Sequence, residues 1–259
     1  MHNALDSAPD LKQQDSSELP AVFLSFPFKE KDGWIRHHLP TVLGGWGYRT
    51  EMGAHFHGRP ISDSVSTTIA KAQLVVCFLM RGSKLASTGW ATSDWLLQEL
   101  GFAKGKGIPA VVIRERGVRA SVGLLGDVQL IELDPAAPFL ALLPLRRTLR
   151  DMLPTPPIKE TLEVRHVARP GAKQNGKQWW DFWTWIDGQS ETLDQIDDVS
   201  YAFPKPFVPR TEPTSNRAAA FGNYGETDEE FDLQVTLDFK SRPKQKIRHR
   251  VTLWRLGYE

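Results

Sequence analysis

The chain has 259 residues, of which 41% are hydrophobic and 24% are charged, so it can bury the core of one large domain or of two ordinary ones. Its 32 basic and 31 acidic residues leave a formal net charge of +1, which excludes recruitment of nucleic acid or of an anionic membrane by overall charge. The single cysteine, Cys77, excludes an internal disulfide and suits a reducing compartment. It lies inside an apolar run, and we expect it to be buried packing.

Residues 1–19 are polar and mixed in charge, which predicts a disordered tail and not a signal peptide. The longest apolar runs, at 74–80 and 139–145, are too short to cross a bilayer. We therefore expect a cytoplasmic protein without membrane contact and without direct nucleic-acid binding.

Residues 20–153 alternate between apolar strands and amphipathic helices. Continuous apolar strands that alternate with helices indicate a parallel sheet covered on both faces. The expected fold class is α/β, with a five-stranded flavodoxin-like doubly wound parallel sheet. The expected strands lie at 21–26, 48–52, 73–79, 109–114 and 127–133, and the expected helices at about 34–43, 61–71, 94–104 and 136–152.

The pattern changes after a proline-rich stretch. Three prolines in residues 154–160 end the last helix and predict a stiff linker. In residues 161–259 the hydrophobic period becomes two, most clearly in FDLQVTLDF at 231–239. A polar stretch then leads into 246–256, which predicts a hairpin, while WWDFWTWI at 179–186 carries large side chains on both faces. Short strands without helical partners predict an all-β sandwich.

Trp95 and Glu99 stand one helical turn apart, so their side chains share a face of the helix at 94–104. Ser93 or Thr92 can cap the start of that helix. On spacing alone, Glu99 has an ordinary explanation as a surface residue at the rim of an amphipathic helix.

The stretch GRPISDSVSTTIAKAQLVVCFLMRGSKLASTGWATSDWLLQE, residues 58–99, resembles the central part of TIR domains. The expected elements follow one another as in that family: a loop that ends in Gly58, a helix, a strand, a serine-rich loop and a helix that begins near Trp95. The segment AVFLSFPFKEKD, which ends in Asp32, resembles the family's first strand and the loop after it. In TIR domains that cleave NAD, the glutamate of the Trp-x-x-x-Glu pattern is catalytic, so the resemblance implies that role for Glu99.

This chemistry needs one carboxylate. Cleavage of the nicotinamide–ribose bond develops oxocarbenium character on the sugar, and nicotinamide leaves from a charged pyridinium without protonation. NAD is then the substrate, and no cofactor is expected. Phe26, at the end of the first strand, is the candidate for stacking on the nicotinamide or adenine ring. Its alternative role is a hydrophobic plug under the loop.

The loop at 51–60 matches the mobile loop of the family, which implies that it gates the site or contacts a neighbouring subunit in a homo-oligomer. Gly58 and Arg59 are its candidate substrate-binding residues; Arg59 can approach a phosphate or remain solvated. His55 and His57 have a spacing that a metal could use, but no further ligand pattern supports them, and we expect no metal.

The second part resembles a YEATS domain of the prokaryotic type that accompanies TIR domains. The segments FWTWIDG, DDVSYAFPKPFVP at 197–209 and FDLQVTLDF carry this resemblance, which implies an immunoglobulin-like sandwich with an aromatic slot. If Phe207 matches the family's phenylalanine, Pro204 and Pro206 replace residues that would orient an acyl-lysine. We therefore expect Tyr224 and Phe207 to mark a slot for an unknown protein or small molecule. The five tryptophans of this part are expected to be mostly core, and either Trp179 or Trp180 can be exposed because the two point to opposite faces.

Together these resemblances imply an NAD glycohydrolase effector regulated by a sensing sandwich, with bacterial anti-phage defence as the context. Two rivals stay open. The TIR-like part can be a non-enzymatic interaction module, or the protein can be another N-glycoside hydrolase or transferase.

Overall fold

The structure is a computed structural model that describes residues 19–53, 63–86, 88–119, 126, 128–154, 161–205 and 207–254. The expected tail before Leu19, the linker residues after Pro154 and the loop residues 54–62 lie outside the described part. The predictions for those segments therefore stay predictions. No described helix is both long and apolar enough to span a membrane.

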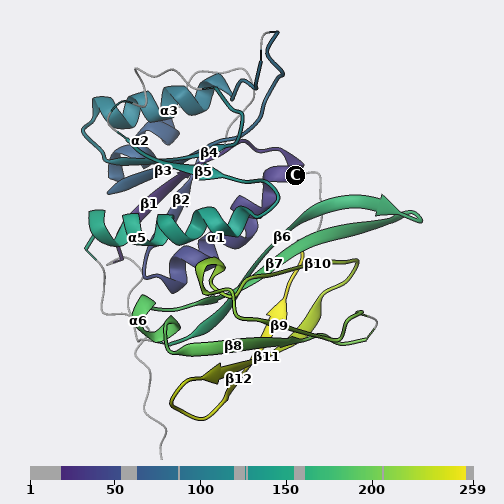
Figure 1. Ribbon diagram of the computed structural model, residues 1–259. Coiled ribbons are helices and arrows are strands. Elements are labelled where there is room, and N and C mark those ends of the chain that lie inside the picture. Colours follow the sequence, from purple (N-terminus) through teal and green to yellow (C-terminus); the bar gives the residue numbers. More distant parts are fainter. Residues whose placement is uncertain are drawn as a thin grey trace, which may run out of the picture.

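A five-stranded parallel sheet organises the first part of the chain (Figure 1). Its strand order, β2-β1-β3-β4-β5, is the order expected for a flavodoxin-like doubly wound sheet. One face packs against α2 and α3, and the other against α1 and α5. The strands are β1 (Ala21–Ser25), β2 (Arg49–Met52), β3 (Leu74–Leu79), β4 (Ala110–Glu115) and β5 (Gln129–Leu133), and the helices are α1 (Gly33–Gly45), α2 (Asp63–Lys71), α3 (Asp94–Gly105) and α5 (Leu142–Met152).

The hydrophobic pattern accounts for these elements. Every residue of β1 and of β3 is buried, as expected for strands covered on both faces. Helix α1 buries side chains at helical spacing, among them Trp34, Leu39 and Val42. It ends at Gly45, and Gly47 follows with a positive φ of 86°, which suits glycine. The expected α/β domain is confirmed.

The second part is a sandwich of two antiparallel sheets. Strand β11 alternates as expected, with Phe231, Leu233 and Val235 buried between exposed residues, and the hairpin with β12 is confirmed but ends at Val251. One sheet consists of β6 (Glu163–Gln174), β7 (Lys177–Asp187) and β10 (Asn223–Thr227), and the other of β8 (Ile196–Ala202), β9 (Thr211–Thr214), β11 (Phe231–Phe239) and β12 (Gln245–Val251). Short helices lie at η2 (Glu30–Asp32), η3 (Pro138–Ala141), α6 (Ser190–Leu193) and η4 (Arg217–Ala219).

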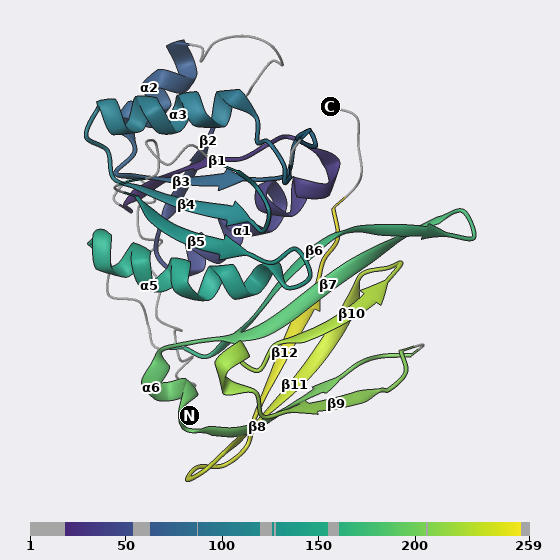
Figure 2. The ribbon, with the colours of Figure 1, turned by 45° about the horizontal axis from the view of Figure 1, so that its top comes forward.

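The two parts share a hydrophobic core, which the sequence does not reveal. The outer face of the β6-β7-β10 sheet lies against α1 and α5 (Figure 2). Trp183 and Trp185 of β7 belong to the cluster formed by these helices, whereas Phe182 and Ile186 lie inside the sandwich. The Trp183 indole also donates a hydrogen bond to the Ala136 carbonyl at 3.0 Å. Strand β7 therefore carries large side chains on both faces because both faces are buried.

The tryptophans of the second part are mostly core, as expected. Trp180, Trp183 and Trp185 are buried, while Trp179 and Trp254 are partly buried.

Asp187, the last residue of β7, joins the two parts at the polar end of this interface. It is only 6% exposed. The Trp46 indole nitrogen donates to its Oδ2 at 2.7 Å, and Arg146 of α5 donates to its Oδ1 at 2.6 Å. Arg165 of β6 donates to Oδ2 at 3.3 Å. A buried carboxylate with charged donors on both sides is tolerated because its hydrogen-bonding capacity is met.

Replacing Asp187 with alanine leaves Arg146 and Arg165 without this carboxylate at the interface. Loss of one partner of a buried ion pair costs about 3–5 kcal/mol, so Asp187→Ala should lower the free energy of unfolding by about that amount. Urea denaturation of the full chain measures it. The exposed Asp197→Ala is the matched control, and an equal effect of both substitutions would show that Asp187 anchors nothing.

Three histidines lie side by side in the same interface, one each on α1, β6 and β12. The His166 Nδ1 and His249 Nε2 atoms are 2.8 Å apart, and the His38 ring centroid lies 4.8 Å from that of His166. Burial lowers the pKa of His38 to about 3 and that of His166 to about 4. Burial and the neighbouring His166 lower the pKa of His249 to about 3. The three rings are therefore neutral at pH 7.

This cluster predicts acid sensitivity. The unfolded chain binds protons on these histidines below pH about 6.5, whereas the folded chain does so only near pH 3–4. The free energy of unfolding should therefore be highest above pH 6.5 and fall as the pH drops from 6.5 toward 4.

His249→Gln should make that fall shallower, because one of the three shifted groups is gone. Urea denaturation of wild type and His249→Gln at several pH values between 7.5 and 4 provides the test. Parallel pH profiles for wild type and His249→Gln would contradict the prediction.

Candidate functional site

The candidate site lies at the carboxyl ends of the parallel strands, where doubly wound sheets bind ligands. Ser25 ends β1 and is paired in register with Cys77 of β3. The Ser25 hydroxyl donates to Glu99 Oε2 of α3 at 2.5 Å. Ser25 is 1% exposed and Glu99 is 0% exposed. The structure thus places the carboxylate inside the protein, in contact with the end of the first strand.

Helix α3 buries Leu96, Glu99, Leu100 and Ala103 on one face. Glu99 lies within that apolar face, so the explanation of Glu99 as a surface residue at the helix rim is wrong. The helix start also differs from the expectation. Ser93 occupies the N-cap position, but its side chain makes no capping hydrogen bond.

Cys77 lies beside this pair. It is fully buried and free, and its Sγ lies 3.8 Å from the Leu96 carbonyl oxygen. Burial raises the pKa of the thiol to about 12; the Ser25 hydroxyl acts against this, and the charge of Glu99 adds to it. A thiol with such a pKa stays protonated and unreactive, and the expectation that Cys77 is packing is confirmed.

Two aromatic residues, Phe26 and Phe28, follow Ser25 at this edge of the sheet. Phe26 is 1% exposed and belongs to the core that contains Trp34, which is the position of a hydrophobic plug; its stacking on a ligand stays a prediction. Phe28 is half-buried. Its ring centroid lies 4.9 Å from that of Phe26 and 6.1 Å from that of Trp95, on which it is stacked. Phe28 was not among the residues predicted for the site, although the FPF triplet at the strand end was a signal.

The remaining residues predicted for this site lie outside the described part of the chain. These are Gly58 and Arg59; His55 and His57, for which no metal was expected, also lie there. Within the described part, no group of three or more His, Cys, Asp or Glu side chains is arranged to hold a metal ion.

Buried carboxyl groups continue along this edge of the sheet. Glu115 at the end of β4 is 4% exposed and accepts a hydrogen bond from the Arg81 backbone nitrogen at 2.8 Å. Asp32 is 2% exposed. Burial raises the pKa of Asp32 to about 7, and the nearby charge of Lys31 acts in the opposite direction.

In the sandwich, Tyr224 and Phe207 do not form one slot, which corrects the expectation. The Tyr224 ring packs against Trp183, 5.4 Å between centroids, whereas Phe207 packs against Phe182, 6.2 Å between centroids. Trp183 and Phe182 are consecutive in β7 and point to opposite faces of the sheet. Tyr224 therefore lies on the outer face, where it is 49% exposed, and Phe207 lies at the sandwich interior.

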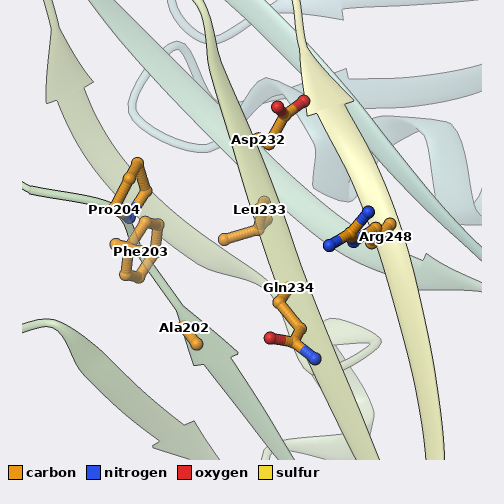
Figure 3. Close-up of a pocket in the computed structure, with 7 residues that line it drawn as sticks. All are labelled: Ala202, Phe203, Pro204, Asp232, Leu233, Gln234 and Arg248. Carbon is orange, nitrogen blue, oxygen red and sulfur yellow. The ribbon is translucent and has the colours of Figure 1, made fainter.

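A crevice opens instead where β8 and β11 separate (Figure 3). Ala202 and Gln234 form the last pair at that end of the two strands. The crevice has a volume of about 440 Å³. Buried Phe203 and Leu233 contribute apolar surface. Its lining consists of Ala202, Phe203, Pro204, Asp232, Leu233, Gln234 and Arg248.

The Ser25 contact can be tested through stability. Ser25→Ala removes the hydroxyl that donates to buried Glu99, and leaving a buried acceptor without its donor costs about 1–3 kcal/mol. The double substitution Ser25→Ala with Glu99→Gln should cost less than the sum of the two singles, because the two side chains interact. Urea denaturation of all four proteins completes the cycle, and strictly additive free energies would show that the contact contributes nothing.

No protein family and no curated protein matches the chain. Solved structures with similarity include the YEATS domain of Yaf9, at 13% identity over 38% of this chain and 79% of that one, with a TM-score of 0.29. The CMP N-glycosidase BcmB of Clostridium botulinum is 17% identical over 48% of this chain and 98% of that one, with a TM-score of 0.33. A β-glucosidase of Listeria innocua is 12% identical over 97% of this chain and 48% of that one, with a TM-score of 0.34. TM-scores this low assign neither a fold nor an activity to the chain.

Proposed function

We propose that the protein is an NAD glycohydrolase that cleaves the nicotinamide–ribose bond, with Glu99 as its catalytic residue. The observation that carries the proposal is the contact between Ser25 and Glu99, buried at the ligand-binding edge of a doubly wound sheet. Burial of a carboxylate is costly, so its presence in an apolar helix face calls for a role. The resemblance of the Trp95 and Glu99 pattern to NAD-cleaving TIR domains supplies that role.

The chemistry follows from the setting of this carboxylate. Glu99 would hold the ribose hydroxyls and stabilise the positive charge that develops on the sugar as nicotinamide departs. An interaction of this kind is stronger in a dry site than in water. Ser25, by donating to Oε2, would fix the orientation of the carboxylate. Trp95 or Phe28 would offer a ring for stacking on a base.

Glu99 has no exposed surface in this conformation, so a substrate reaches it only after neighbouring groups move. The sandwich contacts the segment that follows Phe28, because β6 packs against both η2 and α1. We propose that a ligand of the sandwich, or assembly into a homo-oligomer, triggers the rearrangement. The protein would then act as a cytoplasmic effector in bacterial anti-phage defence.

Complete burial of Glu99 also favours a second candidate function, a non-enzymatic TIR-type interaction module in which the carboxylate only supports the fold. A third candidate is another N-glycoside hydrolase or transferase with the same carboxylate. Incubation of the purified full chain with NAD and a panel of nucleosides and nucleotides separates the three. Nicotinamide or free base is followed by chromatography, with and without a crowding agent and over a hundredfold range of protein concentration.

Glu99→Gln keeps the shape of the side chain and removes its charge. NAD cleavage should fall by at least about a hundredfold, the loss typical for a group that stabilises transition-state charge, while circular dichroism and oligomeric state stay as in wild type. Asp94→Asn, an exposed carboxylate on the same helix, should retain wild-type turnover. Undiminished turnover in Glu99→Gln would reject the catalytic assignment, and absence of turnover in every protein would support the interaction module.

A further inference from the structure

Two lysines in the segment after β1, Lys29 just before η2 and Lys31 within it, converge on one carbonyl oxygen at the carboxyl edge of the sheet. Lys29 Nζ lies 3.3 Å and Lys31 Nζ lies 3.5 Å from the backbone oxygen of Arg81. Arg81 follows β3, so the two ammonium groups gather where β1 and β3 end. Both lysines are exposed. Each ammonium has three N–H donors, so the bond to the carbonyl leaves donors on both for another acceptor.

The described charges nearby do not neutralise this pair. Glu115 lies 3.9 Å from Lys31 Nζ, but it also pairs with Arg81 Nε at 3.4 Å. The Arg81 guanidinium is directed away, since it donates to the Arg116 carbonyl at 3.0 and 2.6 Å. Asp32 is buried with a pKa raised to about 7, so at neutral pH it carries only part of a charge. Among described side chains, the two lysines thus face one carboxyl group that is shared with Arg81 and one buried carboxyl group with a raised pKa.

We propose that Lys29 and Lys31 form a phosphate-binding subsite that receives the diphosphate of a dinucleotide substrate. The subsite lies on the same edge as Glu99, because Lys29 directly follows Phe28, whose ring stacks on Trp95 one turn from Glu99. Two like charges held at one oxygen repel each other, and a bridging anion relieves that repulsion through charge-assisted hydrogen bonds. This inference rests on the proposed function. It adds a basis for preferring NAD over an unphosphorylated nucleoside with the same scissile bond.

The test uses the full-length double variant Lys29→Gln with Lys31→Gln, which keeps polar, unbranched side chains and removes two charges. The matched control is Lys173→Gln with Lys177→Gln, two exposed lysines at the tip of the β6–β7 hairpin. That tip points away from the parallel sheet (Figure 2). Kinetics are measured with NAD and with nicotinamide riboside, which lacks the diphosphate. Binding of inorganic pyrophosphate to each protein is measured separately by calorimetry at low and at physiological salt.

The Lys29 and Lys31 variant should raise KM for NAD roughly tenfold, the change that corresponds to about one lost charge-assisted contact. Its kcat for NAD and its kinetics with nicotinamide riboside should stay unchanged, and its pyrophosphate affinity should fall by a similar factor. Equal effects on both substrates, or the same loss in the control variant, would overturn the subsite. If no protein cleaves NAD, the proposed function fails, but pyrophosphate binding that depends on these two lysines still supports the subsite. Wild-type protein without pyrophosphate binding at low salt would refute it.

Discussion

The carboxylate of Asp187 is the interaction on which the arrangement of the two parts depends. It accepts hydrogen bonds from Trp46, the residue after α1, from Arg146 of α5 and from Arg165 of β6. One buried side chain therefore connects the helices of the first part with the sandwich. Burying a charged group costs free energy, and only well-placed hydrogen-bond donors offset that cost. A donor that moves away leaves the buried group destabilising. The sandwich therefore has one favoured position against the helices, and the tryptophans of β7 pack accordingly.

Helix α1 transmits this constraint toward the candidate site. Its end is held at Asp187 through Trp46, and its middle carries His38 in the buried histidine cluster. Its start at Gly33 follows directly on Asp32, η2 and the loop with Phe28. A shift of the sandwich would therefore move the segment that lies beside the Trp95 ring. Regulation of the site by the sandwich, as proposed, would act along this contiguous path.

The site itself combines a costly group with a closed environment. Glu99 is buried in an apolar helix face, where it accepts a hydrogen bond from Ser25 instead of from water. Such a carboxylate is unsuited to a purely solubilising role. Because Glu99 is completely buried, the proposed function requires a rearrangement before a substrate can reach it. The charged edge at Lys29, Lys31 and Arg81 lies outside that closed region and is open to solvent.

Much of the fold could be predicted from local periodicity. The apolar runs of β1 and β3, the helical spacing of α1 and the alternation of β11 each specify an element type, because side-chain direction repeats with the backbone period. Helical spacing likewise puts Trp95 and Glu99 on one helix face. It could not decide whether that face was a rim or an interior, since periodicity describes a face but not what covers it.

Only the tertiary structure decided the features that depend on contacts between distant segments. The sequence by itself determined a parallel α/β sheet, an antiparallel sandwich and the spacing of Trp95 and Glu99. The fused core around Trp183 and Trp185, the anchor at Asp187 and the separation of Tyr224 from Phe207 required the packing of sheets on helices. The meeting of Lys29 and Lys31 with Arg81 likewise depends on β1 and β3 being neighbours. The physical reason is that these contacts join residues about 20 to 140 positions apart, and local propensity carries no information about such pairs.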